Sequence, residues 1–272
     1  MKKLKSIFEE MGSVVVAYSG GVDSTLALQL AHEFLGERAM AVTAVSASLA
    51  THELEHAQAV AREIGVRHEL ITSHETEDPR YLANAPNRCY FCKSDVYDRL
   101  LDYARDTGFN VVVDGTNADD VGDHRPGRQA ARERGVRSPL QEAGITKAEV
   151  RRLARRYGLS NWDKPASACL SSRIPYGNLI SIEMLSQVEQ AELALKKLGF
   201  NQLRVRHHDQ VARLEVEVGD FEKVLEKREE IVSSVKAAGY TYVTLDLVGF
   251  RSGSMNEVLR SNGHRQTASA AQ

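Results

Sequence analysis

A β-branched apolar run in this chain leads directly into paired glycines and then into a helical pattern. The residues are Val14-Val15-Val16-Ala17-Tyr18-Ser19-Gly20-Gly21-Val22-Asp23-Ser24, and helix-forming residues continue to Phe34. Because glycine has no Cβ, such a turn lets the backbone approach a ligand closely. The hydroxyls of Ser19 and Ser24 and the N–H groups at the helix start favour an anion. We therefore expect a pyrophosphate-binding site at residues 19–24, which we call the glycine turn.

Strand-like and helical segments alternate along the first 160 residues. The expected strands are 13–17, 41–46, 66–71 and 111–114, and the expected helices are 24–35, 51–64, 93–107 and 146–157. Alternation of this kind predicts an α/β fold, a parallel sheet with helices on both faces. Ligands of such sheets bind beyond the carboxyl ends of the strands. The glycine turn, residues 46–48 and residues 114–120, which include Gly115, all lie at such ends.

The chain is long enough for two domains. We expect a nucleotide-binding domain over residues 1–178, including a loop at 160–180 that is rich in reactive side chains, and a smaller α+β domain over residues 179–260. The second domain has the order helix 181–198, strands 203–207 and 211–218, helix 221–238 and strand 241–248. Residues 261–272 are polar and are expected to be a disordered tail.

Charge and composition limit the functions that are plausible. The formal net charge is −2, so no global positive field attracts nucleic acid. Apolar runs are too short to span a membrane, and Glu9 and Glu10 interrupt the basic N-terminus, unlike a secretory signal. Three cysteines do not make a disulfide framework. These features predict a reduced, cytoplasmic protein without a membrane partner.

The three cysteines are candidates for one shared site. Cys89 and Cys92 form a CxxC motif that we place immediately before a helix beginning near Lys93, where thiolates are favoured. Cys169 lies far along the chain, in the loop after the nucleotide-binding domain. Three thiolates could bind zinc with a histidine or water as fourth ligand, or three irons of a four-iron cluster. Buried, inert cysteines are the remaining alternative.

Arginines cluster in the second half of the chain. Arg204 and Arg206 alternate along one strand and so share a face, while Arg173 and Arg251 lie in loops. Guanidinium groups suit a phosphate or carboxylate, although charges on a strand are often merely solvated. His207 and His208 are possible additions to this site.

Several motifs give the whole chain a family resemblance. Ser-Gly-Gly-Val-Asp-Ser resembles the signature of the PP-loop ATP pyrophosphatases. The further segments are 114–120 (DGTNADD), 124–127 (HRPG), 167–173 (SACLSSR), 174–177 (IPYG), 204–206 (RVR) and 244–253 (TLDLVGFRSG). Together they resemble the LarE-type sulfur transferases, which build the sulfur-containing part of the nickel-pincer nucleotide.

This resemblance implies a substrate and a set of roles. ATP adenylates a carboxylate of pyridinium biscarboxylate mononucleotide, and sulfur then displaces AMP to leave a thiocarboxylate. Residues 19, 20, 21, 23 and 24 grip the pyrophosphate, with Gly115 beside them and Asp23 acting through Mg²⁺; Asp119 and Asp120 are secondary Mg²⁺ candidates. The four arginines anchor the substrate phosphate. A homo-oligomer, for which the family suggests a hexamer, is also implied.

One departure concerns the source of sulfur. Sacrificial members of the family give up the sulfur of a single cysteine, which aligns with Ala168, one place before Cys169. With Cys89 and Cys92 also present, this chain is more similar to the branch whose three cysteines hold a [4Fe-4S] cluster with a transferable sulfide. We expect Cys89, Cys92 and Cys169, together with Asp23, to be the catalytic residues.

Other functions compete with this interpretation. They are sacrificial use of Cys169, tRNA thiolation, an ammonia-using synthetase of the NAD or GMP type, and a nucleotide-binding module with structural zinc. The slightly acidic charge argues against tRNA, since basic patches normally supply affinity for RNA. The synthetase gives the cysteines no role.

Overall fold

The computed structural model describes residues 1–122, 126–251 and 253–257. The chain divides into two compact units, Met1–Ala168 and Cys169–Gln272. The boundary that we expected after residue 178 lies inside the second unit. The expected tail at 261–272 and His124 of the HRPG segment lie outside the described residues.

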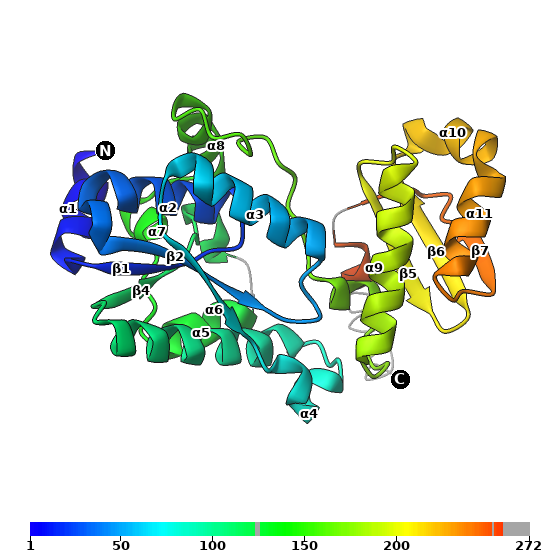
Figure 1. Cartoon of the computed structure of the whole chain (residues 1–272), viewed down its shortest axis with the longest axis horizontal. Coiled ribbons are helices and arrows are strands. Elements are labelled where there is room, and N and C mark those ends of the chain that lie inside the picture. The colour runs from blue at the N-terminus through cyan, green and yellow to red at the C-terminus, as the bar shows by residue number, and fades with distance from the viewer. Residues whose placement is uncertain (123–125, 252, 258–272) are drawn as a thin grey trace, which may run out of the picture. The chain divides into compact units, whose positions relative to one another are not determined.

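The first unit is built on a four-stranded parallel sheet (Figure 1). Its strands are β1 (Val14–Ala17), β2 (Ala39–Val45), β3 (His68–Thr72) and β4 (Val111–Val113), in the order β3-β2-β1-β4. The central strand β1 pairs in register with both neighbours, Val16 opposite Ala41 of β2 and Val113 of β4. The predicted α/β fold is confirmed.

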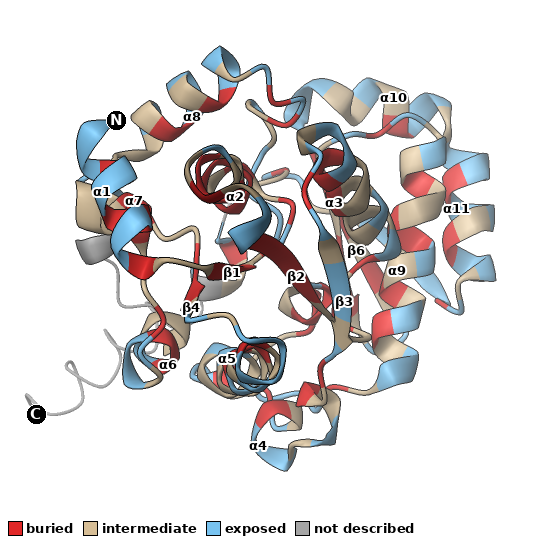
Figure 2. Ribbon diagram, turned by 60° about the vertical axis from the view of Figure 1, so that its left-hand side comes forward, coloured by how far each residue is buried: buried red, intermediate tan, exposed pale blue. Residues whose placement is uncertain are grey.

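Helices cover both faces of this sheet. They are α1 (Lys2–Met11), α2 (Val22–Leu35), α3 (Thr51–Ile64), α4 (Pro79–Leu82), α5 (Arg88–Thr107), α6 (Pro126–Glu133), α7 (Pro139–Ala143) and α8 (Lys147–Arg156). Alternate β1 side chains enter different cores: Val14 and Val16 pack with residues of α1, α2 and α8, and Val15 packs with residues of α5 and α6. Figure 2 shows α2 and α3 over one face and α5 and α6 over the other. Apolar side chains on both sides of β1 thus fix it as the buried centre of the unit.

The second unit is a small α+β fold. A three-stranded sheet has the order β5-β6-β7, with β5 (Leu203–His208) and β6 (Val211–Val216) antiparallel and β7 (Tyr242–Leu245) parallel to β6. Helices α9 (Ile182–Lys197), α10 (Phe221–Glu226) and α11 (Arg228–Ala237) accompany it. Leu203, Val205 and Leu214 join residues of α9 and α11 in one core. Because side chains alternate, the opposite face of the sheet carries the polar residues.

Several details differ from the sequence predictions. Helix α5 begins at Arg88, so Cys89 and Cys92 lie within its first turns and not before it. The helix expected over 221–238 breaks at Lys227 into α10 and α11. Helix α1 was not predicted, although its buried residues Leu4, Ile7, Phe8 and Met11 follow a helical period. No helix among the described residues is long and apolar enough to cross a membrane.

Candidate active site and its two groups of residues

The glycine turn is shaped by hydrogen bonds between its own residues. Gly20 adopts φ +69°, and a Cβ there would lie 2.7 Å from the Cβ of Ala57, so only glycine fits. The Ser24 hydroxyl donates to the Gly21 carbonyl (3.1 Å) and lies 3.1 Å from the Ser19 hydroxyl. Gly21 precedes the first residue of α2, and within the described residues no side chain caps that helix start. The N–H groups in the first turn of helix α2 are therefore not capped by a side chain, which leaves them able to bind an anion beside the glycine turn.

Asp23 is held by two side chains that come from distant parts of the chain. The Asn117 amide donates to its Oδ1 (3.1 Å), and the Lys147 ammonium forms an ion pair with its Oδ2. Lys147 is the first residue of α8, and its backbone N–H donates to Asp119 Oδ2 (2.8 Å). The site therefore contains a cation beside the glycine turn, which the sequence analysis did not predict.

The turn after β4 positions Asn117. Asp114 is buried, and its carboxylate accepts hydrogen bonds from the Thr116 N–H (3.0 Å), the Ser138 hydroxyl (2.7 Å) and the Tyr97 hydroxyl (3.3 Å). Gly115 packs so closely on the start of α2 that a Cβ would lie 2.5 Å from the Ser24 nitrogen. Burial first, and then the neighbouring Asp114 charge, raise the pKa of Tyr97 well above its usual value. This buried hydrogen-bond network holds residues 114–117 against the glycine turn.

The two cysteines of the CxxC motif lie on one side of the start of α5. Cys89 is exposed and Cys92 is partly buried, and their spacing of three residues places them on neighbouring positions of the helix surface. The two residues between the cysteines contact other parts of the first unit. The Tyr90 hydroxyl donates a hydrogen bond to Glu133 (2.5 Å), and the Arg80 guanidinium lies 4.7 Å from the Phe91 ring. Both thiols thus lie at a helix N-terminus, which favours thiolates.

Cys169 is the first residue of the second unit, and it is exposed. It directly precedes a 3-10 turn, Leu170–Arg173, and its carbonyl accepts a hydrogen bond from Arg173 Nη1 (3.0 Å). Among the described residues no three His, Cys, Asp or Glu side chains lie together in a metal-binding arrangement. The three cysteines are divided between the two units, so their joint site remains a prediction.

Arg173 is engaged in a buried ion pair. Its Nε and Nη2 donate to the two oxygens of Glu192 on α9 (2.9 Å each), and both side chains are at most 4% exposed. Glu192 Oε1 also accepts a hydrogen bond from the backbone N–H of Val205, in the edge strand β5 (2.9 Å). Bidentate pairing of this kind fixes orientation as well as charge. Arg173 therefore connects the Cys169 turn to α9 and β5.

Arg206 is buried too, whereas Arg204 has no acidic partner among the described hydrogen bonds and ion pairs. Arg206 donates to Glu215 Oε2 (2.8 Å), to the Ser254 hydroxyl (2.7 Å) and to the Ser172 carbonyl (2.7 Å). Arg204 lies over the Phe250 ring at 5.1 Å. Burial, together with the positive charge of Arg173, lowers the pKa of Arg204 to about 10, so it remains a cation at neutral pH.

Arg251 and His207, two further candidates of the second unit, lie in different surroundings. Arg251 forms an exposed pair with Glu257 (2.6 and 2.9 Å) and lies 3.6 Å from Asp246. His207 is on the core side of β5, where its Nδ1 lies 3.1 Å from the Tyr240 hydroxyl. His207, which we gave only as a possible addition, therefore lies on the face of β5 opposite to Arg204 and Arg206.

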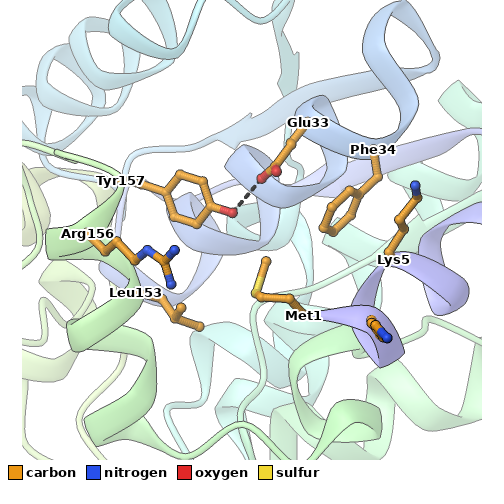
Figure 3. A pocket seen from close by; sticks show the side chains of 8 residues that line it. Met1, Lys5, Glu33, Phe34, Leu153, Arg156 and Tyr157 are labelled. Carbon is orange, nitrogen blue, oxygen red and sulfur yellow. Dashed lines mark hydrogen bonds between the residues drawn. The ribbon is translucent and has the colours of Figure 1, made fainter.

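Two hollows in the first unit lie outside the glycine turn. One, of about 410 Å³, is lined by α1, the end of α2 and α8 (Figure 3). The Tyr157 hydroxyl donates a hydrogen bond to Glu33 there (2.5 Å). Burial and this carboxylate raise the pKa of Tyr157 to about 12. The other, of about 310 Å³, is lined by Asp114, Arg128 and Arg137. Neither hollow contains any of the predicted catalytic residues.

Comparison with known proteins decides the family. The asparagine synthase family model matches residues 9–166. The pyridinium-3,5-bisthiocarboxylic acid mononucleotide synthase of Lactiplantibacillus plantarum is 40% identical over 94% of this chain and 93% of its own length. The chain belongs to the LarE family.

The chain is also similar to other proteins. An uncharacterized protein of Synechocystis is 49% identical over 95% of this chain and 97% of its own length. A tRNA-specific 2-thiouridylase of Rickettsia africae is 28% identical, over 64% of this chain and 57% of the thiouridylase. The predicted fold and enzyme class, an ATP-dependent sulfur transferase with a PP-loop domain, are thereby confirmed.

Proposed function

We propose that this chain adenylates a carboxylate of pyridinium biscarboxylate mononucleotide and converts it to a thiocarboxylate for nickel-pincer nucleotide synthesis. The observation that carries the proposal is the 40% identity, over nearly the whole of both chains, to the synthase of the corresponding bisthiocarboxylic acid. The glycine turn, with Asp23 and Lys147 beside it, supports the ATP-dependent half of the reaction.

The first step makes the carboxylate reactive. A substrate carboxylate oxygen attacks the α-phosphorus of ATP, the bond to the bridging oxygen breaks, and pyrophosphate leaves. The Ser19 and Ser24 hydroxyls and the N–H groups at the start of α2 bind the departing phosphates, and Lys147 neutralises their growing charge. Asp23 would hold Mg²⁺, with Asp119 and Asp120 as further oxygen donors, because carboxylate oxygens suit this ion, and the metal would supply positive charge to the departing phosphates.

The second step replaces AMP with sulfur. A nucleophilic sulfur attacks the acyl carbon, and AMP leaves with the bonding electrons to give the thiocarboxylate. Arg204 binds the substrate phosphate, since it is the arginine of the polar face with no carboxylate pair described. Arg206, Arg173 and Arg251 shape this face and add positive charge, but each already binds an acidic side chain.

The three cysteines are assigned to the sulfur-transfer step. Cys89, Cys92 and Cys169 would hold a [4Fe-4S] cluster as thiolate ligands. Cys89 and Cys92 lie at a helix N-terminus, and Cys89 and Cys169 are exposed. Such a cluster would supply sulfide for the transfer. In the alternative route Cys169 attacks the acyl adenylate itself, and elimination of the thiocarboxylate leaves dehydroalanine.

Pyrophosphate release tests the central claim. Purified protein with ATP, Mg²⁺ and the pyridinium mononucleotide should release pyrophosphate and AMP, and mass spectrometry should find the thiocarboxylate. Asp23→Ala and Lys147→Met should each abolish most of the release, since losing one charge-assisted contact costs about 1.5–3 kcal/mol. Arg152→Met, which removes an exposed cation elsewhere on α8, is the matched control and should behave like wild type. Pyrophosphate release with bulk tRNA, but none with the mononucleotide, would favour tRNA thiolation instead.

Metal analysis and peptide mass mapping separate the two sulfur sources. Anaerobically purified protein should be brown and contain about four irons per chain, and replacing any of the three cysteines should remove the colour and repeated turnover. Colourless protein that makes one thiocarboxylate and acquires dehydroalanine at Cys169 would establish the sacrificial route. Zinc without iron and without pyrophosphate release would favour the nucleotide-binding module.

We also propose that the enzyme works as a homo-oligomer. Leu247 and Val248, in the loop after β7, are 79% and 65% exposed and are candidates for a subunit contact. Light scattering after size exclusion should give a mass that is a multiple of the chain mass; a monomer at micromolar concentration would contradict this.

A further inference from the structure

The segment that leads to Cys169 is attached to the first unit at two places. Near its start, the Asn161 amide donates to the Gly20 carbonyl of the glycine turn (3.0 Å) and to the Thr25 hydroxyl (2.8 Å). Near its end, the Lys164 ammonium and the Ser167 hydroxyl donate to the two oxygens of Glu53 (2.7 and 2.8 Å). Glu53 therefore fastens the last residues before Cys169 to the beginning of α3.

The Glu53 carboxylate is largely buried and stays ionised, which suits it to hold the segment before Cys169. Its side chain is only 15% exposed, and that of Lys164 only 18%. Burial alone would raise the pKa of Glu53, but hydrogen bonds from His52, Lys164 and Ser167 and the charge of Lys164 hold it well below its usual range. The carboxylate is thus ionised at every pH at which the enzyme works, and its two oxygens bind two points of the segment together.

Cys169 is anchored on its other side by the second unit. Its carbonyl accepts a hydrogen bond from Arg173, whose guanidinium is fixed by Glu192. Only Ala168 separates this anchored residue from Ser167, which binds Glu53. Two residues of extended chain span about 7 Å at most. Cys169 therefore has little freedom while both anchors are in place.

We propose that Glu53 is a positioning residue that limits where the Cys169 sulfur can go during sulfur transfer; this rests on the proposed function. Without Glu53, the next side-chain anchor described on the first unit is Trp162, seven positions before Cys169, whose ring packs on the core and lies 5.0 Å from the Arg155 guanidinium. Seven extended residues span about 25 Å, compared with about 7 Å from Ser167, so the distance that the thiol can reach from its anchor on the first unit grows more than threefold. A wider reach lowers the effective concentration of sulfur at the acyl adenylate. Adenylation, which does not use Cys169, keeps its rate.

The test compares Glu53→Gln with Glu55→Gln. Glu55 is an exposed residue of the same helix and serves as the matched control. Glu53→Gln keeps the size of the side chain but removes the charge that holds Lys164. We expect pyrophosphate release within twofold of wild type, thiocarboxylate formation in a single turnover slowed about tenfold, and Cys169 alkylated several times faster by iodoacetamide, as measured by peptide mapping. Glu55→Gln should match wild type in all three measurements.

The outcomes separate this proposal from its alternatives. Unchanged alkylation and unchanged sulfur transfer in Glu53→Gln would overturn it, as would an equal loss of both reaction steps, which indicates a general structural role. A thermal unfolding scan shows whether the variant is folded, and Glu53→Asp, which keeps the charge, should restore part of the sulfur-transfer rate. If wild type releases no pyrophosphate with the mononucleotide, the proposed function fails, while the alkylation rates still test the anchoring of Cys169.

Discussion

Replacing Gly115 with alanine tests whether the turn after β4 maintains the shape of the glycine turn. The added Cβ would lie 2.5 Å from the Ser24 nitrogen, 2.7 Å from its Cα and 2.8 Å from the Asp23 carbonyl carbon. Ordinary contact begins at 3.4 Å, so the shortfall is 3.4 − 2.5 = 0.9 Å. All three atoms belong to the backbone of α2, and none can move away as a flexible side chain would.

Two effects should follow from this clash. Overpacking of this kind costs about 1–3 kcal/mol, and each kcal/mol lowers Tm by about 2–4 °C in a protein of this size. The turn also carries Asn117, which orients Asp23, so a displacement near 1 Å reaches the phosphate site. Misplacement by about 1 Å can slow a reaction about 100-fold. We therefore expect pyrophosphate release to fall between about tenfold and 100-fold.

The assay combines thermal unfolding with pyrophosphate release at saturating substrate. Gly219→Ala is the matched control, because Gly219 lies outside the left-handed region of φ and a Cβ there meets no atom within 4 Å. That variant should keep both Tm and activity. If Gly115→Ala also kept the Tm and the release rate of wild type, the turn after β4 would not support the glycine turn, and our account of Asp23 would be wrong.

Three further predictions concern the same two units. Thr146→Ala removes the side-chain cap of α8 and should cost about 1 kcal/mol in unfolding experiments; because Lys147 follows directly, pyrophosphate release should fall as well. Arg204→Lys places a group of lower pKa in the same buried, positively charged surroundings, so the lysine loses its proton as pH rises. Substrate affinity, measured by calorimetry, should therefore weaken from pH 7 to 9 in the variant and stay constant in wild type. Arg206→Ala removes the 2.8 Å ion pair of the buried Glu215 and leaves it the longer contact with Arg213 (3.4 Å). The loss should be up to about 3–5 kcal/mol of stability in urea, whereas removing both charges should cost less.

Local sequence patterns were sufficient to predict the architecture of both units. The valines of β1 are apolar at every position, as expected for a strand with a core on each side, and the glycines after it locate the turn at the carboxyl end of the sheet. The capping residues Thr146 and Glu149 were also predicted, and both halves of their reciprocal pair are present. Such features depend on residues a few positions apart, which a sequence displays directly.

Features formed by residues far apart in the chain could not be predicted in this way. Lys147 and Asp23 are 124 positions apart, and only the packing of α8 beside α2 brings them together. The carboxylates that bind Arg173 and Arg206 come from α9 and β6, and identifying them requires the register of β5 on β6. A pattern of arginines therefore indicates an anion site without telling which guanidinium groups are already paired.

The ion pair between Asp23 and Lys147 suggests how one site can bind both Mg²⁺ and polyphosphate. Each side chain is about one-third exposed, and each currently neutralises the other. If Mg²⁺ and the phosphates bind here together, as proposed, Asp23 would gain a cation and Lys147 an anion, so neither charge would be left unpaired. Polyphosphate without the metal would instead add negative charge beside Asp23, and the metal alone would add positive charge beside Lys147. On the proposed function, the pair would therefore favour the Mg²⁺–ATP complex over either component alone, and the hydrogen bond from Asn117 would keep Asp23 oriented while its partner changes.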